Sequence, residues 1–344
     1  MIEFLFAYGL FLAKVVTGLL ALVLVIAIIA GSRKREDSSE LKVTHLNDKF
    51  DALKKRLQQA LMSKKDFKEL TKTEAKEAKK KAKGKTKEAT DETKPRLFVL
   101  EFEGDIKASE VVSLRDEITA VLSVADKGDE VLLKLENAGG IVHEHGLAAS
   151  QLKRIKDAGL RLTISVDKVA ASGGYMMACI ADKIVAAPFA ILGSVGVIAQ
   201  LPNFNRLLDK AGIDFEQHTA GDFKRTLTMF GKNSNKERAK LKEELEETHV
   251  LFQNFVSEHR PQLNMAEIAT GEHWYGTKAL ELKLVDELIT SDQLLIENLD
   301  SFDLYQIEVD IKQGLQEKLL GGFLGAIESA KLALVGQRQD QRYK

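Results

Sequence analysis

The chain has one cysteine, Cys179, in 344 residues, and this excludes an internal disulfide. Cys179 lies in an apolar stretch, so we expect a buried structural thiol, and cysteine usage leaves the cellular compartment open. The Gly-x-Gly-x-x-Gly pattern is also absent from the sequence. Because that pattern forms the phosphate-binding turn of dinucleotide folds, its absence argues against a dinucleotide-binding domain.

The formal net charge of −1 conceals a strongly uneven distribution. Residues 64–94 contain twelve lysines, and no aromatic residue follows Phe67 in that segment. Interleaved glutamates and the lack of aromatic stacking groups argue against nucleic-acid binding. We expect a solvated linker, helical or disordered, or a basic segment that contacts anionic lipid headgroups.

Charge is missing altogether from residues 15–31, an apolar run close to the N-terminus. As a helix this run would rise about 26 Å, and the upstream apolar residues extend it past the roughly 30 Å hydrocarbon core. The basic cluster RKR at 33–35 follows the run, whereas cleaved signals carry their charge before it. We therefore expect an uncleaved, single-pass transmembrane helix in a cell inner membrane. The cluster itself favours a cytoplasmic C-terminal side.

The chain divides into four segments. Residues 1–35 would be the anchor with its basic flank. Residues 36–95 would be an amphipathic helix (36–62) followed by the lysine-rich linker. Residues 96–300 would form the main domain, and residues 301–344 a terminal strand and amphipathic helix. Strands alternate with helices after Pro95, which predicts an α/β fold with parallel pairing. We expect strands at 97–102, 130–135, 160–166, 184–187, 195–199 and 215–218, and helices at 111–122, 145–158, 175–181, 204–211 and 235–259.

Ser172 is the strongest candidate for a reactive side chain. It lies in the stretch AASGGY (170–175), after an apolar strand and at the expected start of a helix. Small flanking residues fit a turn where backbone approaches a substrate, and the amides of Ser172 and Gly173 would face a developing oxyanion. A helix-capping serine is the alternative interpretation.

A serine nucleophile needs a base, and Lys224 in GDFKR (221–225) is a candidate. A lysine acts as a base only when its ammonium form is destabilised, which requires burial among apolar groups. Lowering its pKa from about 10.4 to the range 7–8 costs about 4 kcal/mol. Gly139 and Gly140 follow a strand and could supply a second oxyanion N–H, or form an ordinary turn.

Histidines offer a competing arrangement. A Ser-His-Asp triad could use His143, His145 or His218, although the first two begin a helix, where imidazoles are more often surface or capping groups. The pair His143 and His145 has no third ligand at a suitable spacing, so we expect no metal and no cofactor.

Three ordered segments resemble the signal peptide peptidase A family of serine–lysine peptidases. They are VDKVAASGGY (166–175), GSVGV (193–197) and AGDFK (220–224), with HWYG (273–276) and LVDE (284–287) similar to the family's closing elements. The resemblance runs from the N-terminal apolar run to about residue 288. It implies a spiral of repeated β-β-α units, as in ClpP protease and crotonase.

The resemblance also implies roles for individual residues. Ser172 would form the acyl-enzyme, Lys224 would be the general base and then the acid, and Ser194 would orient the Lys224 amine. The amides of Gly139 and Gly173 would form the oxyanion hole. In the loop before the glycines the family usually has Ser-Pro, whereas this chain has Asn137 and Ala138 and so lacks the φ restraint of proline.

The function implied is a membrane-bound serine endopeptidase that cleaves apolar peptides, such as signal-peptide remnants, or membrane-associated proteins. Family members form rings in which neighbouring subunits complete the active site, so we expect a homo-oligomer, with interfaces from residues 235–259 and 315–334. Several relatives face the periplasm, which leaves the side of the membrane open. Two alternatives remain: a crotonase-like acyl-CoA enzyme that does not need Ser172, and a non-catalytic oligomeric membrane scaffold.

Overall fold

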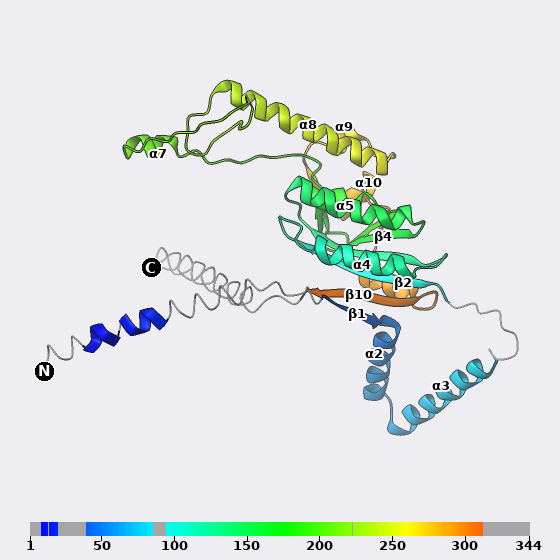
Figure 1. The fold of residues 1–344 in the computed structure, drawn as a ribbon. Helices are drawn as coiled ribbons and strands as arrows, with labels where there is room; N and C mark the ends of the chain where they lie inside the picture. Colours follow the sequence, from blue (N-terminus) through cyan, green and yellow to red (C-terminus); the bar gives the residue numbers. More distant parts are fainter. Residues whose placement is uncertain (1–7, 13, 20–38, 85–93, 222, 312–344) are drawn as a thin grey trace, which may run out of the picture. The chain divides into compact units, whose positions relative to one another are not determined.

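The structure is a computed structural model that describes residues 8–12, 14–19, 39–84, 94–221 and 223–311. Residues 41–309 form one compact unit (Figure 1). The remaining described residues belong to a second unit, in which residues 8–12 and 14–19 are helical.

The described part of the compact unit is built on a mixed ten-stranded sheet with the path β1-β10-β2-β3-β4-β6-β9. Strands β2, β3, β4, β6 and β9 pair in parallel, and β5 leaves the path to link β3 with β7, which pairs antiparallel with β8. The strands are β1 (Ser39–His45), β2 (Arg96–Gly104), β3 (Glu130–Asn137), β4 (Arg161–Val166), β5 (Val169–Ala171), β6 (Lys183–Ala186), β7 (Ile191–Gly193), β8 (His273–Tyr275), β9 (Glu287–Leu288) and β10 (Asp303–Ile311).

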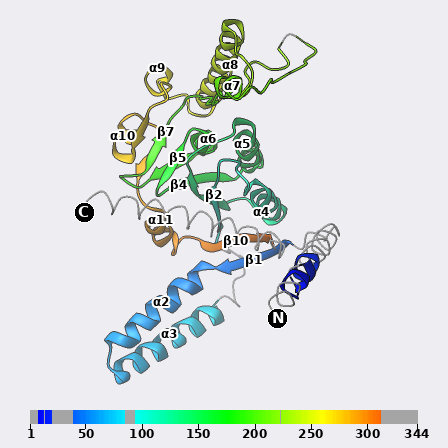
Figure 2. The ribbon, with the colours of Figure 1, turned by 90° about the vertical axis from the view of Figure 1, so that its left-hand side faces the viewer.

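Helices cover the sheet on both faces, which is typical of parallel pairing. Alternate residues of β2 divide between two apolar clusters: Leu100 packs with α4 and α5, whereas Val99 packs with α2 and α11. Figure 2 shows the same unit turned by 90°, with α2 and α3 projecting from β1. The helices are α2 (Leu46–Leu61), α3 (Lys64–Gly84), α4 (Val111–Val124), α5 (Val142–Asp157), α6 (Gly173–Ala178), α7 (Asn205–Lys210), α8 (Asn235–His259), α9 (Met265–Ile268), α10 (Gly276–Glu281) and α11 (Ser291–Asn298).

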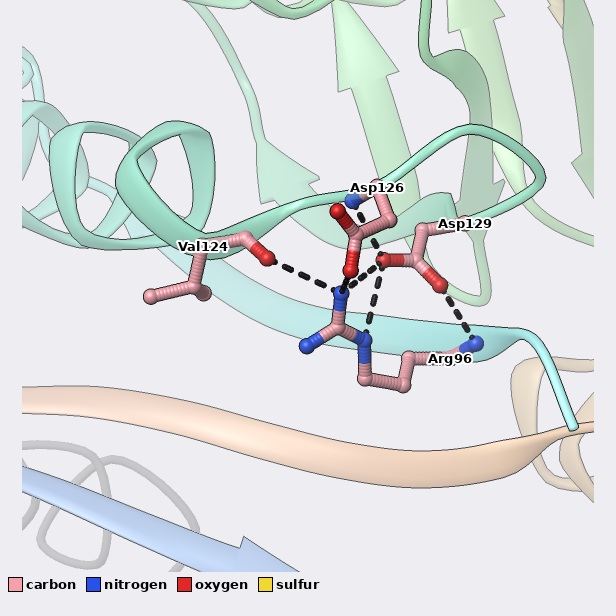
Figure 3. A network of polar contacts seen from close by, with 4 residues as sticks. All are labelled: Arg96, Val124, Asp126 and Asp129. Atoms are coloured by element: carbon pink, nitrogen blue, oxygen red, sulfur yellow. Dashed lines mark hydrogen bonds and ion pairs between the residues drawn. The ribbon is translucent and has the colours of Figure 1, made fainter. Parts of the chain in front are cut away.

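The first strand of the parallel set is fixed at its start by Arg96 (Figure 3). The Arg96 guanidinium donates to Asp129 Oδ2 at 2.9 and 2.6 Å and to the Val124 carbonyl at 2.9 Å, and the Arg96 N–H donates to Asp129 Oδ1 at 2.7 Å. Asp126 adds an exposed contact at 2.8 Å. The end of α4, the loop after it and the start of β2 are thereby joined in one polar network.

The α/β class and most expected elements are confirmed, and α6 begins directly after Ser172 as the sequence predicts. Cys179 is a free, fully buried thiol as expected, and burial raises its pKa far above the usual range. Two expected strands are wrong, because residues 195–199 and 215–218 have no regular structure. Both lie in the segment between β7 and α8, where no neighbouring strand accepts their backbone bonds.

Residues 36–62 are not one helix, because β1 occupies Ser39–His45 and α2 begins only at Leu46. The alternation of Leu41, Lys42, Val43 and Thr44 has a period of two, which fits the strand that pairs along β10. Lysine-rich residues Lys64–Gly84 are helical. Domain boundaries at 95 and 300 stay a prediction, although β10 pairs with β2 in one sheet.

Among the described residues, no helix is both long and apolar enough to cross a bilayer. Most of the expected anchor, residues 20–31, lies outside the described residues, as does the expected C-terminal helix at 315–334. Residues 184–199 form β6, β7 and a loop, and the side chains of both strands are largely buried.

Candidate active site

Ser172 lies at a sharp turn between β5 and α6. Its backbone has φ +52° and ψ −118°, a region where a side chain is strained, and its N–H donates to the Gly193 carbonyl at 2.8 Å. The Ser172 carbonyl accepts the Met176 N–H at 3.0 Å in the first turn of α6. The turn is therefore held from both sides, and its serine is half-buried rather than a free surface group.

The glycines after Ser172 are required by close packing. A Cβ at Gly174 would lie 2.1 Å from the Asn137 carbonyl oxygen, and one at Gly173 would lie 2.4 Å from the His145 ring. Tyr175 follows them fully buried, with its hydroxyl donating to the Leu284 carbonyl at 2.9 Å. The sequence Gly-Gly-Tyr thus lets α6 enter the core directly behind the reactive turn.

A cavity of about 70 Å³ opens at Ser172. Its wall combines backbone of the glycine loop and of α6 with apolar side chains from the segment after β7 and from α8. Such a lining suits the apolar side chain of an extended peptide. The lining residues are Gly140, Val142, Ser172, Gly173, Met176, Gly196, Val197, Ile198, Thr248 and Phe252.

The glycine loop lies against this turn, as the sequence predicts. Gly139 has φ +89°, and a Cβ there would lie 2.7 Å from Ser172 Cβ and 2.9 Å from the Gly173 nitrogen. The Gly139 N–H, however, donates to Asn137 Oδ1 at 2.7 Å and is already engaged. Gly140 rather than Gly139 lines the cavity.

Beneath the loop lies a buried polar pair that the sequence interpretation missed. His145 is fully buried, with Nδ1 at 2.9 Å from the Ile141 carbonyl and Nε2 at 3.2 Å from Asn137 Oδ1. The prediction of a surface or capping His145 is therefore wrong. The signal was present: His145 continues the buried stripe of α5, at three to ten residues before its apolar members Ala148, Ala149, Leu152 and Ile155.

Ser194 is also at a strained position, with φ +53°. Its N–H donates to the Glu272 carbonyl at 2.7 Å, and its Oγ donates to the Gly271 carbonyl at 3.4 Å, a long contact. No hydrogen bond joins Ser194 to Lys224 among the described residues. The segment before β8 therefore holds the Ser194 backbone while leaving its hydroxyl weakly bound.

Lys224 is exposed and is not among the residues that line the cavity at Ser172. The burial that a lysine base requires is thus absent in this single chain. The physical reason is local: residues 213–219 have no regular structure, and the flanking Phe223 is itself half exposed. Figure 1 shows α7, in the same segment, well away from the sheet.

The competing arrangements gain no support from the described residues. His218 is exposed and contacts only Glu216, and His143 is exposed beside Glu144. In the described part of the chain no three His, Cys, Asp or Glu side chains gather as a metal-binding group. The structure therefore brings Ser172, Gly139, Gly140 and Gly173 together and leaves Lys224 apart.

Comparison with known proteins addresses the family directly. Models of the peptidase family S49 N-terminal region and of peptidase family S49 match residues 3–152 and 154–301. A probable protease SohB of Haemophilus influenzae is 48% identical, over 92% of this chain and 92% of that protein. One of Buchnera aphidicola is 49% identical, over 90% and 91%. A solved membrane-bound stomatin-specific protease with a substrate peptide is 13% identical, with a TM-score of 0.44 over 67% of this chain and 98% of that chain. The resemblance seen in the sequence is confirmed, and the chain belongs to peptidase family S49.

Proposed function

We propose that this protein is a membrane-anchored serine endopeptidase that works through an acyl-enzyme on Ser172, with a ClpP- and crotonase-like spiral as its fold. The observation that carries the proposal is the strained Ser172 turn, which opens onto a cavity beside two glycine backbones. Strain of this kind, about 1–3 kcal/mol, persists where the surroundings over-determine it and is frequent at catalytic groups.

In this mechanism Ser172 Oγ attacks the scissile carbonyl of a bound peptide, and neutral Lys224 takes the hydroxyl proton. The N–H of Gly173 stabilises the oxyanion together with a second donor. We assign the role of second donor to the Gly140 N–H. The Gly139 N–H is hydrogen-bonded to Asn137 Oδ1 and would have to break that bond before it could donate to the oxyanion. Lys224 then returns the proton to the leaving amine, and water releases the acyl group from Ser172 by the reverse route.

Lys224 needs a partner surface to become a neutral base, and we assign that role to a neighbouring copy of the chain. The segment between β7 and α8 exposes many large apolar side chains, an amount typical of an interface rather than a free surface. Packing of this segment on another copy would desolvate Lys224 and bring it to a serine, with Ser194 orienting its amine. The exposed apolar residues are Ile198, Leu201, Phe204, Leu207, Ile213, Phe215, Phe223 and Phe230.

The membrane part of the proposal rests on residues 15–31, which are apolar and uncharged. We infer a single-pass anchor in a cell inner membrane, with apolar peptides or membrane-associated proteins as substrates. The apolar lining of the cavity, including Val142, Met176 and Phe252, supports this substrate class.

A serine-directed fluorophosphonate probe tests the chemistry on the purified full chain. We expect labelling that Ser172→Ala abolishes and Ser123→Ala leaves unchanged, since Ser123 lies exposed on α4. Lys224→Ala should slow labelling at least about 100-fold, in the range of lost general-base catalysis. Lys210→Ala, an exposed lysine at the end of α7, is the matched control.

Full peptidase activity in purified Lys224→Ala would sink the serine–lysine mechanism. Undiminished acyl-CoA turnover by Ser172→Ala would instead favour the crotonase-like alternative. Cellular function that survives Ser172→Ala would favour a scaffold.

A further inference from the structure

Helix α2 carries an apolar stripe that begins inside the protein and continues into solvent. Leu46 is buried and Phe50 packs on the same cluster as Leu97 and Leu295. The stripe then continues with Leu53, Leu57 and Leu61, whose exposed fractions are 55%, 61% and 77%. Since residues three and four apart share a helix face, these five side chains form one line along α2.

The charges of α2 are sorted around this stripe. At roughly 100° per residue, Lys54 lies on one flank, about 60° from Leu57, and Lys49 and Arg56 lie on the other, about 80° and 100° away. Asp48 and Asp51 lie on the far side, about 180° and 120° from Leu57, together with Lys55 at about 160°. An apolar stripe bordered by cations, with its acids turned away, is typical of a helix that lies in a lipid–water interface.

The neighbouring helix reinforces the same sign of charge. Residues 46–84, which hold α2 and α3, contain thirteen basic and six acidic side chains, whereas the rest of the chain has 37 basic and 45 acidic ones. Figures 1 and 2 show α2 and α3 joined by a turn and projecting away from β1. The projecting hairpin is thus positive and complements a negatively charged surface.

We propose that the exposed stripe of α2 inserts at the headgroup level of an anionic bilayer, with the basic flanks of α2 and the lysines at 64–72 of α3 facing lipid phosphates. The inference rests on the proposed membrane anchor for its geometry. Only fourteen residues separate residue 31 from Leu46, so extended chain would hold α2 within about 50 Å of the anchor's end. The membrane, rather than another copy, is favoured because the three exposed leucines have cations on both flanks and lie a short length of chain from a membrane-spanning candidate.

A fluorescent label at position 57 tests the proposal in the full-length chain. Leu57→Cys gives one reactive thiol, because Cys179 is the sole cysteine and is buried. The protein, labelled with an environment-sensitive dye, is reconstituted in phosphatidylcholine vesicles with and without phosphatidylglycerol. We expect the emission maximum to move to shorter wavelength only when phosphatidylglycerol is present. The shift should disappear when Lys49, Lys54 and Arg56 are changed to glutamine, or when the salt concentration is raised. A label at Val112→Cys, on α4, should not respond to lipid charge.

Emission at position 57 that is the same in both kinds of vesicle overturns the proposal. So does a shift in detergent that grows with protein concentration, because it would show that another copy covers the stripe. Sedimentation with vesicles after alkaline extraction reports the anchor separately. If alkaline extraction removes the protein but the emission still shifts with lipid charge, the anchor is refuted and the α2 proposal is supported. If the protein stays with the vesicles and reacts with the serine probe but the label at position 57 does not respond, only the α2 proposal is rejected.

Discussion

His145 Nε2 lies 3.2 Å from Asn137 Oδ1, the same oxygen that accepts the Gly139 N–H at 2.7 Å. One buried side chain therefore connects the start of α5 with the glycine loop beside Ser172. Asn137 and Ala138 stand where related peptidases usually have Ser-Pro, so the loop has no proline to restrict it. The hydrogen bonds of Asn137 supply a restraint of a different kind, from side chain to backbone.

Replacing His145 with alanine should weaken both the fold and the site. We expect the free energy of unfolding to fall by about 2–4 kcal/mol in urea titrations, because a fully buried ring and its polar contacts are lost. Acylation of Ser172 by the probe should also slow in conditions where the variant is fully folded. His143→Ala, with a side chain 83% exposed, should change stability by less than about 0.5 kcal/mol. Unchanged acylation in folded His145→Ala would refute the positioning role.

A methyl group at Gly173 should be damaging, whereas one at Gly146 should not. Gly173→Ala places a Cβ 2.4 Å from the His145 ring, so we expect a loss of about 1–3 kcal/mol and slower labelling of Ser172. Gly146 lies inside α5 with no atom near its missing Cβ, and Gly146→Ala should raise stability by about 0.5–1 kcal/mol. Thermal unfolding of the two variants checks the contrast, and equal melting temperatures would contradict it.

Glu117 should make the protein less stable as pH rises from about 4.3 to about 7. Burial raises the pKa of Glu117 to about 7, although the Val309 N–H bonded to it acts in the opposite direction. The folded chain then binds a proton that the unfolded chain releases near pH 4.3, so stability is lost between about pH 4.3 and 7. Glu117→Gln should exceed the wild type by up to about 3 kcal/mol near pH 8 and match it near pH 4. Asp300→Asn, at an exposed carboxyl, should change stability by less than about 0.5 kcal/mol near pH 8.

Asp129 should behave in the opposite way. Burial raises its pKa, but the hydrogen bonds and charge of Arg96 outweigh burial and hold the pKa below its usual range. Its contribution is therefore present above about pH 4 and is lost as pH falls through the folded-state pKa. Asp129→Asn should cost about 2–3 kcal/mol near pH 7 and less in acid. Asp126→Asn, with a side chain 86% exposed in the same network, should cost under about 0.5 kcal/mol. Similar losses for both would disprove the assignment.

Much of the fold follows from local patterns. Strands β2 to β4 are rich in apolar residues, α5 and α8 have clear helical periodicity, and Ser172 stands at the helix start that its glycines indicate. The strands expected at 195–199 and 215–218 are wrong because short apolar runs in an irregular segment have the same local composition as strand residues. Local sequence contains no information on which surface they meet.

The candidate site could be predicted from the sequence only in part. The family resemblance predicts that Gly139 lies beside Ser172, and the structure has that contact. The engagement of the Gly139 amide by Asn137 depends on a side-chain rotamer that the sequence does not specify. Lys224 lies in a segment that is largely exposed and irregular, and local sequence does not specify which residues such a segment approaches.

The strained turn at Ser172 also affects how this sequence can change over generations. Glycine would adopt the same backbone conformation without the strain that a Cβ causes at this φ. The serine at this position therefore lowers the stability of the folded chain. Replacing Ser172 with glycine should therefore stabilise the folded chain, because the substitution removes the backbone strain without adding any atom to the core. Under the proposed mechanism, chemistry and fold therefore place opposite demands on position 172: glycine would relieve the backbone strain and remove the nucleophile.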